Sequence, residues 1–112
     1  MPHDLLSAKF AALADPTRRA ILARLALGET TLRELAQPLA MTTPGVAKHL
    51  GVLERAGLIA RGARSAVRPV RLQPEAFSEM EGWIDACRQH WEGSFDRLAA
   101  HLGAETGDGQ TR

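Results

Sequence analysis

The last third of the chain carries residue types that bind metal ions, at helical spacing. Cys87 and His90 stand three residues apart, and Asp85, Glu92 and His101 lie on the same predicted helix. A thiolate and an imidazole one turn apart suit zinc. Cys87 also falls on an apolar stripe, where a small buried cysteine is the usual interpretation. We therefore expect packing there, with a zinc site and a redox-sensing thiol as the alternatives.

Patterns typical of catalysis are missing from the sequence. It contains no GxSxG, P-loop or GxGxxG pattern. His3, His49, His90 and His101 stand in separate contexts with no paired carboxylate. Trp83 is typical of a core or interface anchor rather than a stacking partner for a cofactor. We expect neither an enzyme nor a bound cofactor.

Basic residues gather in one segment, although the whole chain is nearly neutral. The 14 Lys and Arg residues against 13 Asp and Glu residues give a net charge of +1. Residues 73–112 carry a net charge of −5. Residues 58–72 hold no acidic residue and four arginines, which are Arg61, Arg64, Arg68 and Arg71. This segregation favours an edge that faces a polyanion, with a solvated basic hairpin as the alternative.

Length and composition fit a single soluble domain. The chain has 112 residues, of which 45% are hydrophobic and 24% charged. No run of 18 apolar residues predicts a membrane span, and the first ten residues lack a secretory signal. A single cysteine fits a reducing compartment. We therefore expect a cytoplasmic protein with no membrane partner.

Two helices are predicted in the first quarter of the chain. Apolar residues recur at intervals of three and four over residues 5–13 and again from Pro16 onward. Asp15 caps the second helix, and Pro16 fits its first position, where no N–H donor is needed. Gly28 ends it, since glycine tolerates the left-handed conformation. Arg18-Arg19 on this helix either contact DNA or form structural ion pairs.

Two more short helices follow, joined by a tight turn. Thr31 and Glu34 match a capping box at the start of the third helix, and Pro38 stops or distorts its end. Thr43 is expected to cap the fourth helix and Pro44 to occupy its first position, as Asp15 and Pro16 do in the second helix. Its core-facing residues, spaced by four and three, are Val46, Leu50 and Leu53.

A basic hairpin and a long helix complete the chain. Residues 58–61 and 70–72 predict two strands, and Pro69 places the second strand at an edge or starts it late. The helix that follows covers about residues 74–102, and residues 103–112 predict a disordered tail. Its near-heptad apolar stripe is too long for so small a domain to cover, so a second copy is the expected partner. The predicted dimer interface is Leu6, Phe10, Phe77, Met80, Ile84, Cys87, Trp91, Phe95 and Leu98.

Two short helices followed by a two-stranded basic ribbon predict a winged helix-turn-helix. The expected fold is mainly α with a small β-hairpin wing, in the order α-α-α-α-β-β-α. The fourth helix then enters the major groove of DNA by its N-terminal half. Its residues outside the core stripe there include Thr43, Gly45, Lys48 and His49.

The sequence resembles the metal-independent branch of the ArsR/SmtB family of bacterial regulators. The motifs ADPTRRxIL and AKHLxVLExAGLI and the basic ribbon carry the resemblance, which covers residues 5–102. It implies a homodimeric repressor bound to a palindromic operator in double-stranded DNA, and hence a place at the bacterial nucleoid. The recognition helix corresponds to residues 43–56 and the wing to residues 62–68. The two recognition helices of a dimer then lie about 34 Å apart.

The candidate DNA contacts combine this resemblance with the helix face. They are Thr42, Thr43, Pro44, Gly45, Ala47, Lys48, His49, Arg61, Arg64, Ser65 and Arg68. The chain departs from the family pattern at three places: Ala47 replaces a usual serine, Gly51 a frequent basic or polar residue, and Ala40 the glycine of the turn. A left-handed Ala40 costs about 1 kcal/mol relative to glycine.

Two alternatives to a plain repressor remain. One alternative is a winged-helix module that binds another protein and no DNA. Its support is that Ala47 has no hydroxyl and that Gly45 and Gly51 have no side chains to contact DNA. A sensor that releases DNA when a metal or small molecule binds the last helix is the other, although no effector is indicated. The family's classical metal site needs cysteines in the third helix, and TLRELAQPL has none. We therefore expect no metal site.

Overall fold

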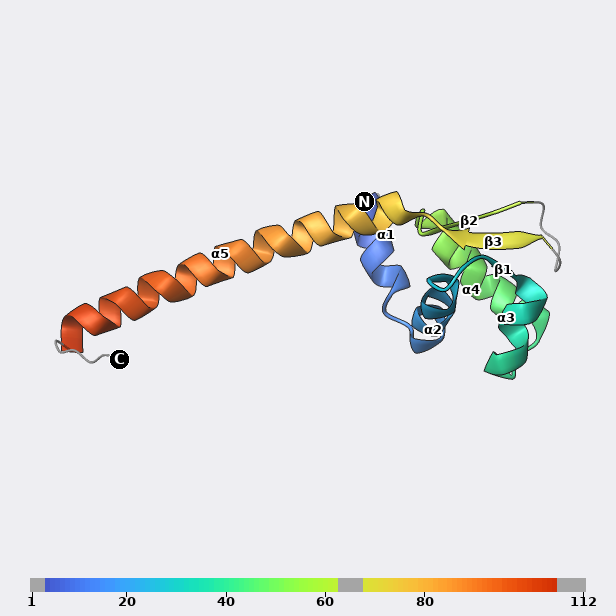
Figure 1. Cartoon of the computed structure of the whole chain (residues 1–112), viewed down its shortest axis with the longest axis horizontal. Coiled ribbons are helices and arrows are strands. Elements are labelled where there is room, and N and C mark those ends of the chain that lie inside the picture. Colours follow the sequence, from blue (N-terminus) through green and yellow to red (C-terminus); the bar gives the residue numbers. More distant parts are fainter. Residues whose placement is uncertain (1–3, 63–67, 107–112) are drawn as a thin grey trace. The chain divides into compact units, whose positions relative to one another are not determined.

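The computed structural model describes residues 4–62 and 68–106, with side chains up to residue 103. Figure 1 shows the helices and strands that these residues form. The elements are α1 (Leu5–Ala12), α2 (Pro16–Leu25), β1 (Thr30–Thr31), α3 (Leu32–Leu39), α4 (Thr43–Arg55), β2 (Ile59–Arg61), β3 (Pro69–Leu72) and α5 (Pro74–Thr106). In this described part, no helix combines the length and apolar character that a membrane span requires.

Side-chain caps start the first two helices. The carboxylate of Asp4 accepts from the backbone N–H of Ser7 at 2.6 Å, and Asp15 accepts from that of Arg18 at 3.0 Å. Pro16 occupies the first turn of α2, as predicted. Gly28 has a positive φ of 139° and follows the last turn of α2. The predicted boundaries of α2 are therefore confirmed to within a few residues.

Helix α3 begins with the predicted capping box and ends in a left-handed residue. The hydroxyl of Thr31 accepts from the backbone N–H of Glu34, and the Glu34 carboxylate accepts from that of Thr31, both at 3.2 Å. Pro38 lies inside the last turn of the helix. Ala40 then adopts φ 55° and ψ 38°, the conformation that glycine usually supplies.

The small sheet has three strands, one more than the sequence predicts. Its order is β1-β3-β2, and both pairings are antiparallel. Two-residue β1 carries no alternating pattern, which is why the sequence does not reveal it. Of the two alternatives that Pro69 leaves for this strand, the edge position is wrong, because β3 lies in the centre (Figure 1). Pro69 is tolerated there as the first residue of its strand.

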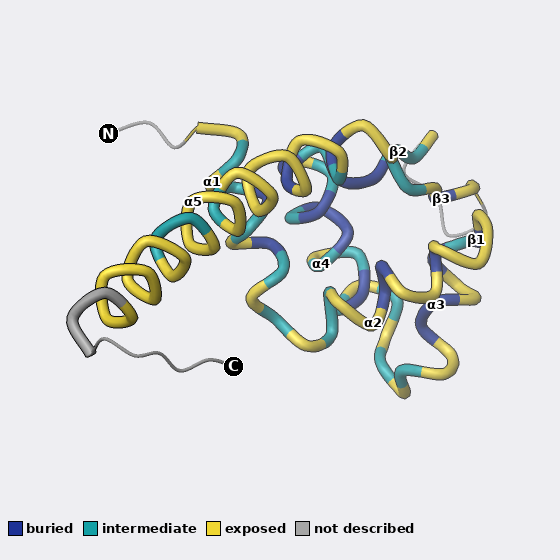
Figure 2. The backbone as a smooth tube through the Cα atoms, turned by 60° about the vertical axis from the view of Figure 1, so that its left-hand side comes forward, coloured by how far each residue is buried: buried dark blue, intermediate teal, exposed yellow. Residues whose placement is uncertain are grey.

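One hydrophobic core holds the part of the chain that ends at Met80. Val46, Leu50 and Leu53 of α4 are completely buried, as their spacing predicts. They pack with buried apolar residues of α2, α3, the strands and the first turns of α5, and Figure 2 shows these buried positions in dark blue. The ammonium of Lys9 is also buried and forms an ion pair with Glu79, which fastens α1 to the start of α5.

Helix α5 extends from the core into a second compact unit, which begins at Glu81. Beyond Met80 most of its side chains are exposed. The helix continues to Thr106, past the predicted end at residue 102. Gly103 alone does not stop it, because one glycine inside a helix costs only about 1 kcal/mol. The predicted tail is therefore helical at its start, and the remainder lies outside the described residues.

Candidate nucleic-acid interface

Helix α4 separates a buried face from an exposed one. Its core stripe repeats every three or four residues and fixes which side of the helix faces inward. Counting 100° per residue, Pro44, Lys48, Gly51 and Arg55 lie on the opposite side. Pro44, Lys48 and Arg55 are exposed. This face carries two positive charges and no acidic residue.

The cap of α4 lies one residue earlier than predicted. Thr42 caps the helix, since its hydroxyl accepts from the backbone N–H of Gly45 at 3.2 Å, and Thr43 is the first helical residue. Pro44 is compatible with a cap at Thr42 or at Thr43, because a proline is tolerated throughout the first turn of a helix. Thr42 and Pro44 are exposed, whereas Thr43 and Gly45 are half-buried. The free N–H groups of this helix start favour an anion nearby.

Lys48 and its two neighbours differ in exposure. Lys48 is exposed, and Ala47 beside it is half-buried. His49 turns back toward the start of α2, where its Nδ1 lies 3.9 Å from Oδ2 of Asp15, and only 22% of its side chain is exposed. The structure therefore favours Lys48 for reaching DNA, while His49 links α4 to α2.

Asp15 both caps α2 and lies next to His49 of α4. The hydrogen bond from the Arg18 backbone lowers the pKa of the Asp15 carboxyl below its ordinary value of 3.8, and the charges of Arg18 and His49 act in the same direction. The sequence predicts Asp15 as a cap but not its second role, because position 49 is distant along the chain.

Arg18 and Arg19 bind the end of α1. The Arg18 guanidinium donates from Nε to the carbonyl of Ala12 at 2.7 Å and from Nη2 to that of Ala11 at 3.3 Å. Arg19 donates from Nη1 to the carbonyl of Leu13 at 2.6 Å. Of the two alternatives for this pair, the structure favours the structural one, in which the partners are helix-end carbonyls rather than carboxylates.

Arg61, one of the predicted DNA contacts on the hairpin, faces the interior of the protein. Arg61 pairs with Val70 in the sheet register and so shares the inner face with Ile59, because alternate residues of a strand face opposite sides. Its Nε lies 3.2 Å from Oε1 of Glu54, and its side chain is 8% exposed. Arg61 thus ties the hairpin to α4. This placement argues against a DNA contact by Arg61.

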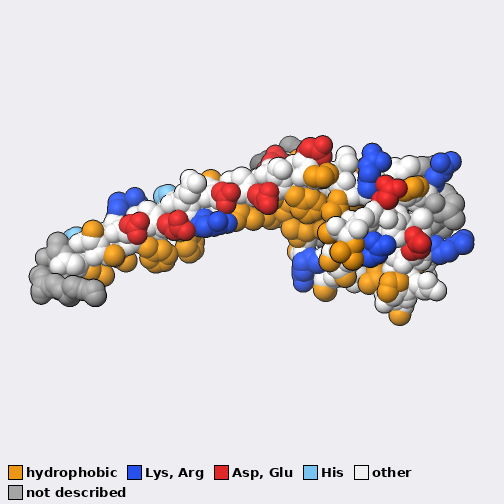
Figure 3. Space-filling model, in the orientation of Figure 1, with side chains coloured by type: hydrophobic (Ala, Val, Ile, Leu, Met, Phe, Trp, Pro, Cys, Tyr) orange, Lys and Arg blue, Asp and Glu red, His pale blue; other side chains and the backbone are white. Residues whose placement is uncertain are grey.

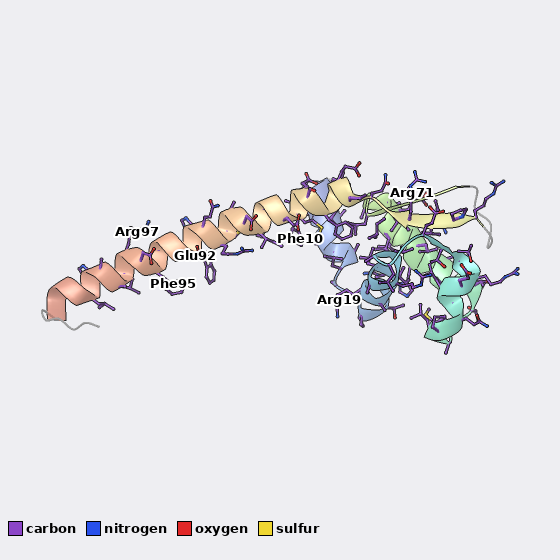
Figure 4. The ribbon with its side chains drawn as sticks, in the orientation of Figure 1. Phe10, Arg19, Arg71, Glu92, Phe95 and Arg97 are labelled. Atoms are coloured by element: carbon purple, nitrogen blue, oxygen red, sulfur yellow. The ribbon has the colours of Figure 1, made fainter. Side chains whose placement is uncertain are left out.

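The outer end of the hairpin is partly described. Gly62 and Arg68, the last described residues on either side of residues 63–67, are exposed. The predicted contacts Arg64 and Ser65 lie outside the described residues. Arg71, on the outer face of the sheet opposite Ala60, is also exposed and is labelled in Figure 4.

Comparison with known proteins identifies the family. A model described as a helix-turn-helix domain matches residues 13–61. The HTH-type transcriptional regulator Rv2034 of Mycobacterium tuberculosis is 39% identical over 74 residues, which cover 66% of this chain and 69% of Rv2034. The crystal structure of the ArsR family transcriptional regulator RHA00566 is 40% identical, with a TM-score of 0.73, over 80% of this chain and 98% of that one. This chain belongs to the ArsR family of transcriptional regulators.

Two further matches bear on this ArsR family regulator. The transcriptional repressor SdpR of Bacillus subtilis is 38% identical over 50 residues, which cover 45% of this chain and 56% of SdpR. The homodimeric winged helix-turn-helix DNA-binding domain Mb0332 of Mycobacterium bovis is 22% identical, with a TM-score of 0.61, over 80% of this chain and 84% of that one. The second match supports the fold alone. The predicted winged helix-turn-helix is confirmed.

The long helix of the ArsR family regulator presents a second candidate surface. Trp91, Phe95 and Leu98 are each more than half exposed, and Trp91 meets Phe95 edge to face, with ring centroids 6.4 Å apart. Hydrophobic side chains follow one edge of α5 in Figure 3, and Figure 4 shows Phe95 and Arg97 on opposite sides. The apolar stripe predicted for residues 84–98 therefore lies on one exposed face.

Four of the residues predicted for this interface also contact the core of the protomer. Met80 is 4% exposed and buried within its own chain. Leu6, Phe10 and Phe77 are partly buried against the same core. A stripe read from sequence does not distinguish contacts inside one protomer from contacts with a second copy. Burial makes Met80 unavailable to a second copy, whereas the interface role of Leu6, Phe10 and Phe77 stays a prediction.

The metal-binding residue types do not converge in the described part of the regulator. No group of three or more His, Cys, Asp or Glu side chains within residues 4–62 and 68–103 has the spacing to hold an ion. Cys87 is half-buried, and His90 is exposed. Asp85 forms an ion pair with Arg88, whose Nη2 lies 3.1 Å from its Oδ1.

Proposed function

We propose that this ArsR family regulator is a homodimeric repressor that binds a palindromic operator. Helix α4 enters the major groove, and the β2–β3 hairpin lies along the flanking DNA. The observation that carries the proposal is the exposed Lys48 on the face of α4 opposite its buried stripe. A recognition helix must have this division, with one side anchored in the core and the other free for base edges.

Contacts at the start of α4 complete the proposed interface. The N-terminal turn of α4 carries small side chains. Thr42 and Pro44 are exposed there, and Thr43, Gly45 and Ala47 are half-buried. Small side chains there allow the helix start, with its partial positive charge, to approach phosphate closely. Lys48, one turn further on, donates to guanine O6 or N7. Exposed Arg68 contributes a phosphate contact from the hairpin.

A second copy of α5 is the proposed partner of the apolar face. Trp91, Phe95 and Leu98 expose hydrophobic area that a symmetric dimer buries. The Mycobacterium bovis domain that shares this fold is itself homodimeric. In such a dimer the two recognition helices meet successive major grooves, about 34 Å apart.

Repression is the proposed direction of regulation. The relative SdpR is a transcriptional repressor. A regulator bound at a promoter represses by blocking access to it. The proposed place of action is accordingly the bacterial cytoplasm, at the nucleoid.

The deciding experiment measures binding to DNA from the protein's own promoter. Fluorescence anisotropy with labelled promoter DNA and with unrelated DNA of equal length is recorded across a salt titration. Lys48→Ala is expected to weaken promoter binding and to reduce the salt slope by about 0.9 per protomer. Arg97→Ala on α5 is the control of equal charge change, with binding expected to stay within about twofold.

Two outcomes would overturn the proposal. Equal affinity of the wild type for both DNAs at every salt concentration would exclude sequence-specific regulation. Absence of any DNA binding would favour the alternative of a winged-helix module for protein partners.

A further inference from the structure

The glycine at position 51 leaves a space that an arginine fills. Gly51 is a buried residue of α4, although its spacing places it on the exposed face. A Cβ added there would lie 3.2 Å from Nη1 of Arg55 and 3.8 Å from both Cζ and Nη2. The guanidinium of Arg55 therefore lies directly over Gly51, one turn back toward the start of the helix.

Arg55 shares the exposed stripe with Lys48. The two residues stand seven positions apart, so they differ by only about 20° around the helix axis. Both lie opposite the stripe of Val46, Leu50 and Leu53, which is completely buried. Because helical side chains lean toward the N-terminus, Arg55 brings its charge closer to Lys48 than its position in the chain indicates.

No neighbouring carboxylate holds the Arg55 guanidinium. Within residues 4–62 and 68–103 its side chain takes part in no hydrogen bond or ion pair. It borders a hollow of about 360 Å³ between α1 and α4, which is lined by Ser7, small apolar residues and Arg18, with no acidic residue. Arg18 is already anchored to the carbonyls that end α1. The donors of Arg55 are thus available to an external anion.

We propose that Arg55 is a DNA-contacting residue that binds a backbone phosphate from the surface position above Gly51. This inference rests on the proposed DNA-binding function and extends the interface along the whole exposed face of α4. A phosphate is the expected ligand, since residues near the start of a recognition helix reach base edges and Arg55 is the last residue of α4. The planar guanidinium matches two phosphate oxygens.

The experiment removes the positive charge of Arg55 and then places a positive charge at position 51 instead. Arg55→Ala is expected to lower affinity about tenfold near 0.1 M salt and to reduce the salt slope by about 0.9 per protomer. The loss should be equal for promoter and unrelated DNA, as for a phosphate contact. The double variant Gly51→Lys with Arg55→Ala returns a cation to the same position and should recover wild-type affinity to within about threefold.

Matched variants separate this inference from the proposed function. Arg97→Ala again controls for charge, and circular dichroism confirms that each variant keeps its helices. If Lys48→Ala weakens binding while Arg55→Ala does not, the role of Arg55 is wrong and the proposed function stands. If Arg55→Ala weakens binding and Gly51→Lys gives no recovery, the surface position above Gly51 is the wrong site. If the wild type does not bind DNA, both proposals fail together.

Discussion

At the scale of single residues, Ala40 carries a conformational cost. It ends α3 with φ 55°, and no other non-glycine residue among those described has a positive φ. In this conformation the Cβ of an L-residue lies too close to its own backbone, whereas glycine has no Cβ. The turn between α3 and α4 positions the proposed recognition helix. The backbone strain at Ala40 therefore lies in a segment that matters for the proposed function.

The variant Ala40→Gly should therefore stabilise the protein. We expect the free energy of unfolding to rise by about 1 kcal/mol, because relief of the left-handed strain exceeds the extra entropy of glycine in the unfolded chain. Urea unfolding of both proteins measures the difference. Ala26→Gly is the control, since Ala26 ends α2 with φ −64° and should gain nothing. Equal or lower stability of Ala40→Gly would contradict the strain at this turn.

Asp15 predicts a dependence of stability on pH. Its pKa is lower in the folded protein than the ordinary value of 3.8, chiefly through the hydrogen bond from the Arg18 backbone. The ionised carboxylate therefore stabilises the fold above pH 3.8, and this contribution is lost as the pH falls through the folded-state pKa. Asp15→Asn keeps an oxygen that can cap the helix but does not titrate.

The measurement compares the two proteins at several pH values. The stability advantage of the wild type over Asp15→Asn should be complete at about pH 7 and should shrink toward about pH 3. A constant difference between the two proteins over this range would show that the Asp15 carboxylate is not stabilised by folding.

Individual site residues could be predicted only where local chemistry fixes their direction. The core stripe of α4 determined that Lys48 faces outward. His49 and Arg61 were assigned to DNA by residue type, but each has an acidic partner from another part of the fold, Asp15 and Glu54. The helical period places Arg55 on the face of Lys48, but the position of its guanidinium over Gly51 depends on the side-chain conformation, which the sequence does not give.

At the scale of elements, the pair of Arg61 and Glu54 joins the hairpin to α4. Arg61→Met keeps the aliphatic bulk and removes the ion pair, so we expect the free energy of unfolding to fall by about 2 kcal/mol. Combining it with Glu54→Gln in a double-mutant cycle isolates the energy of the pair. Arg68→Met, at an exposed position, should change stability by less than about 0.5 kcal/mol.

The same variants distinguish a structural from a DNA-binding role. Unchanged stability of Arg61→Met together with weaker DNA binding would return Arg61 to the interface. Lower stability with unchanged salt slope would confirm that it acts inside the protein.

Most elements could be predicted from periodicity and caps, and the exceptions have physical causes. The capping box of α3 and the cap at Asp15 satisfy free backbone groups locally, so the sequence alone reveals them. Strand β1 depends on pairing with Val70, forty residues away, and so has no local signal. The central place of β3 depends on that same pairing.

At the scale of the whole molecule, the apolar face of α5 is the proposed surface for assembly with a second copy. Trp91→Glu places a charge in the centre of this face, where a second copy would have to bury it. Sedimentation should show this variant as a monomer at micromolar concentration, whereas the wild type is expected to be a dimer. Gln89→Glu adds the same charge on the opposite side of the helix and should leave the dimer intact. A Trp91→Glu dimer that persists would exclude this face as the interface.

The shortness of the sheet has a consequence for solubility. Its outer strands, β1 and β2, have two and three residues, and the longest strand lies between them. An edge this short offers few unpaired backbone groups for an incoming strand of another chain. Growth into extended β-aggregates is therefore disfavoured at both edges of the described sheet. Among the described elements, self-association is then expected to use helical surfaces such as the apolar face of α5.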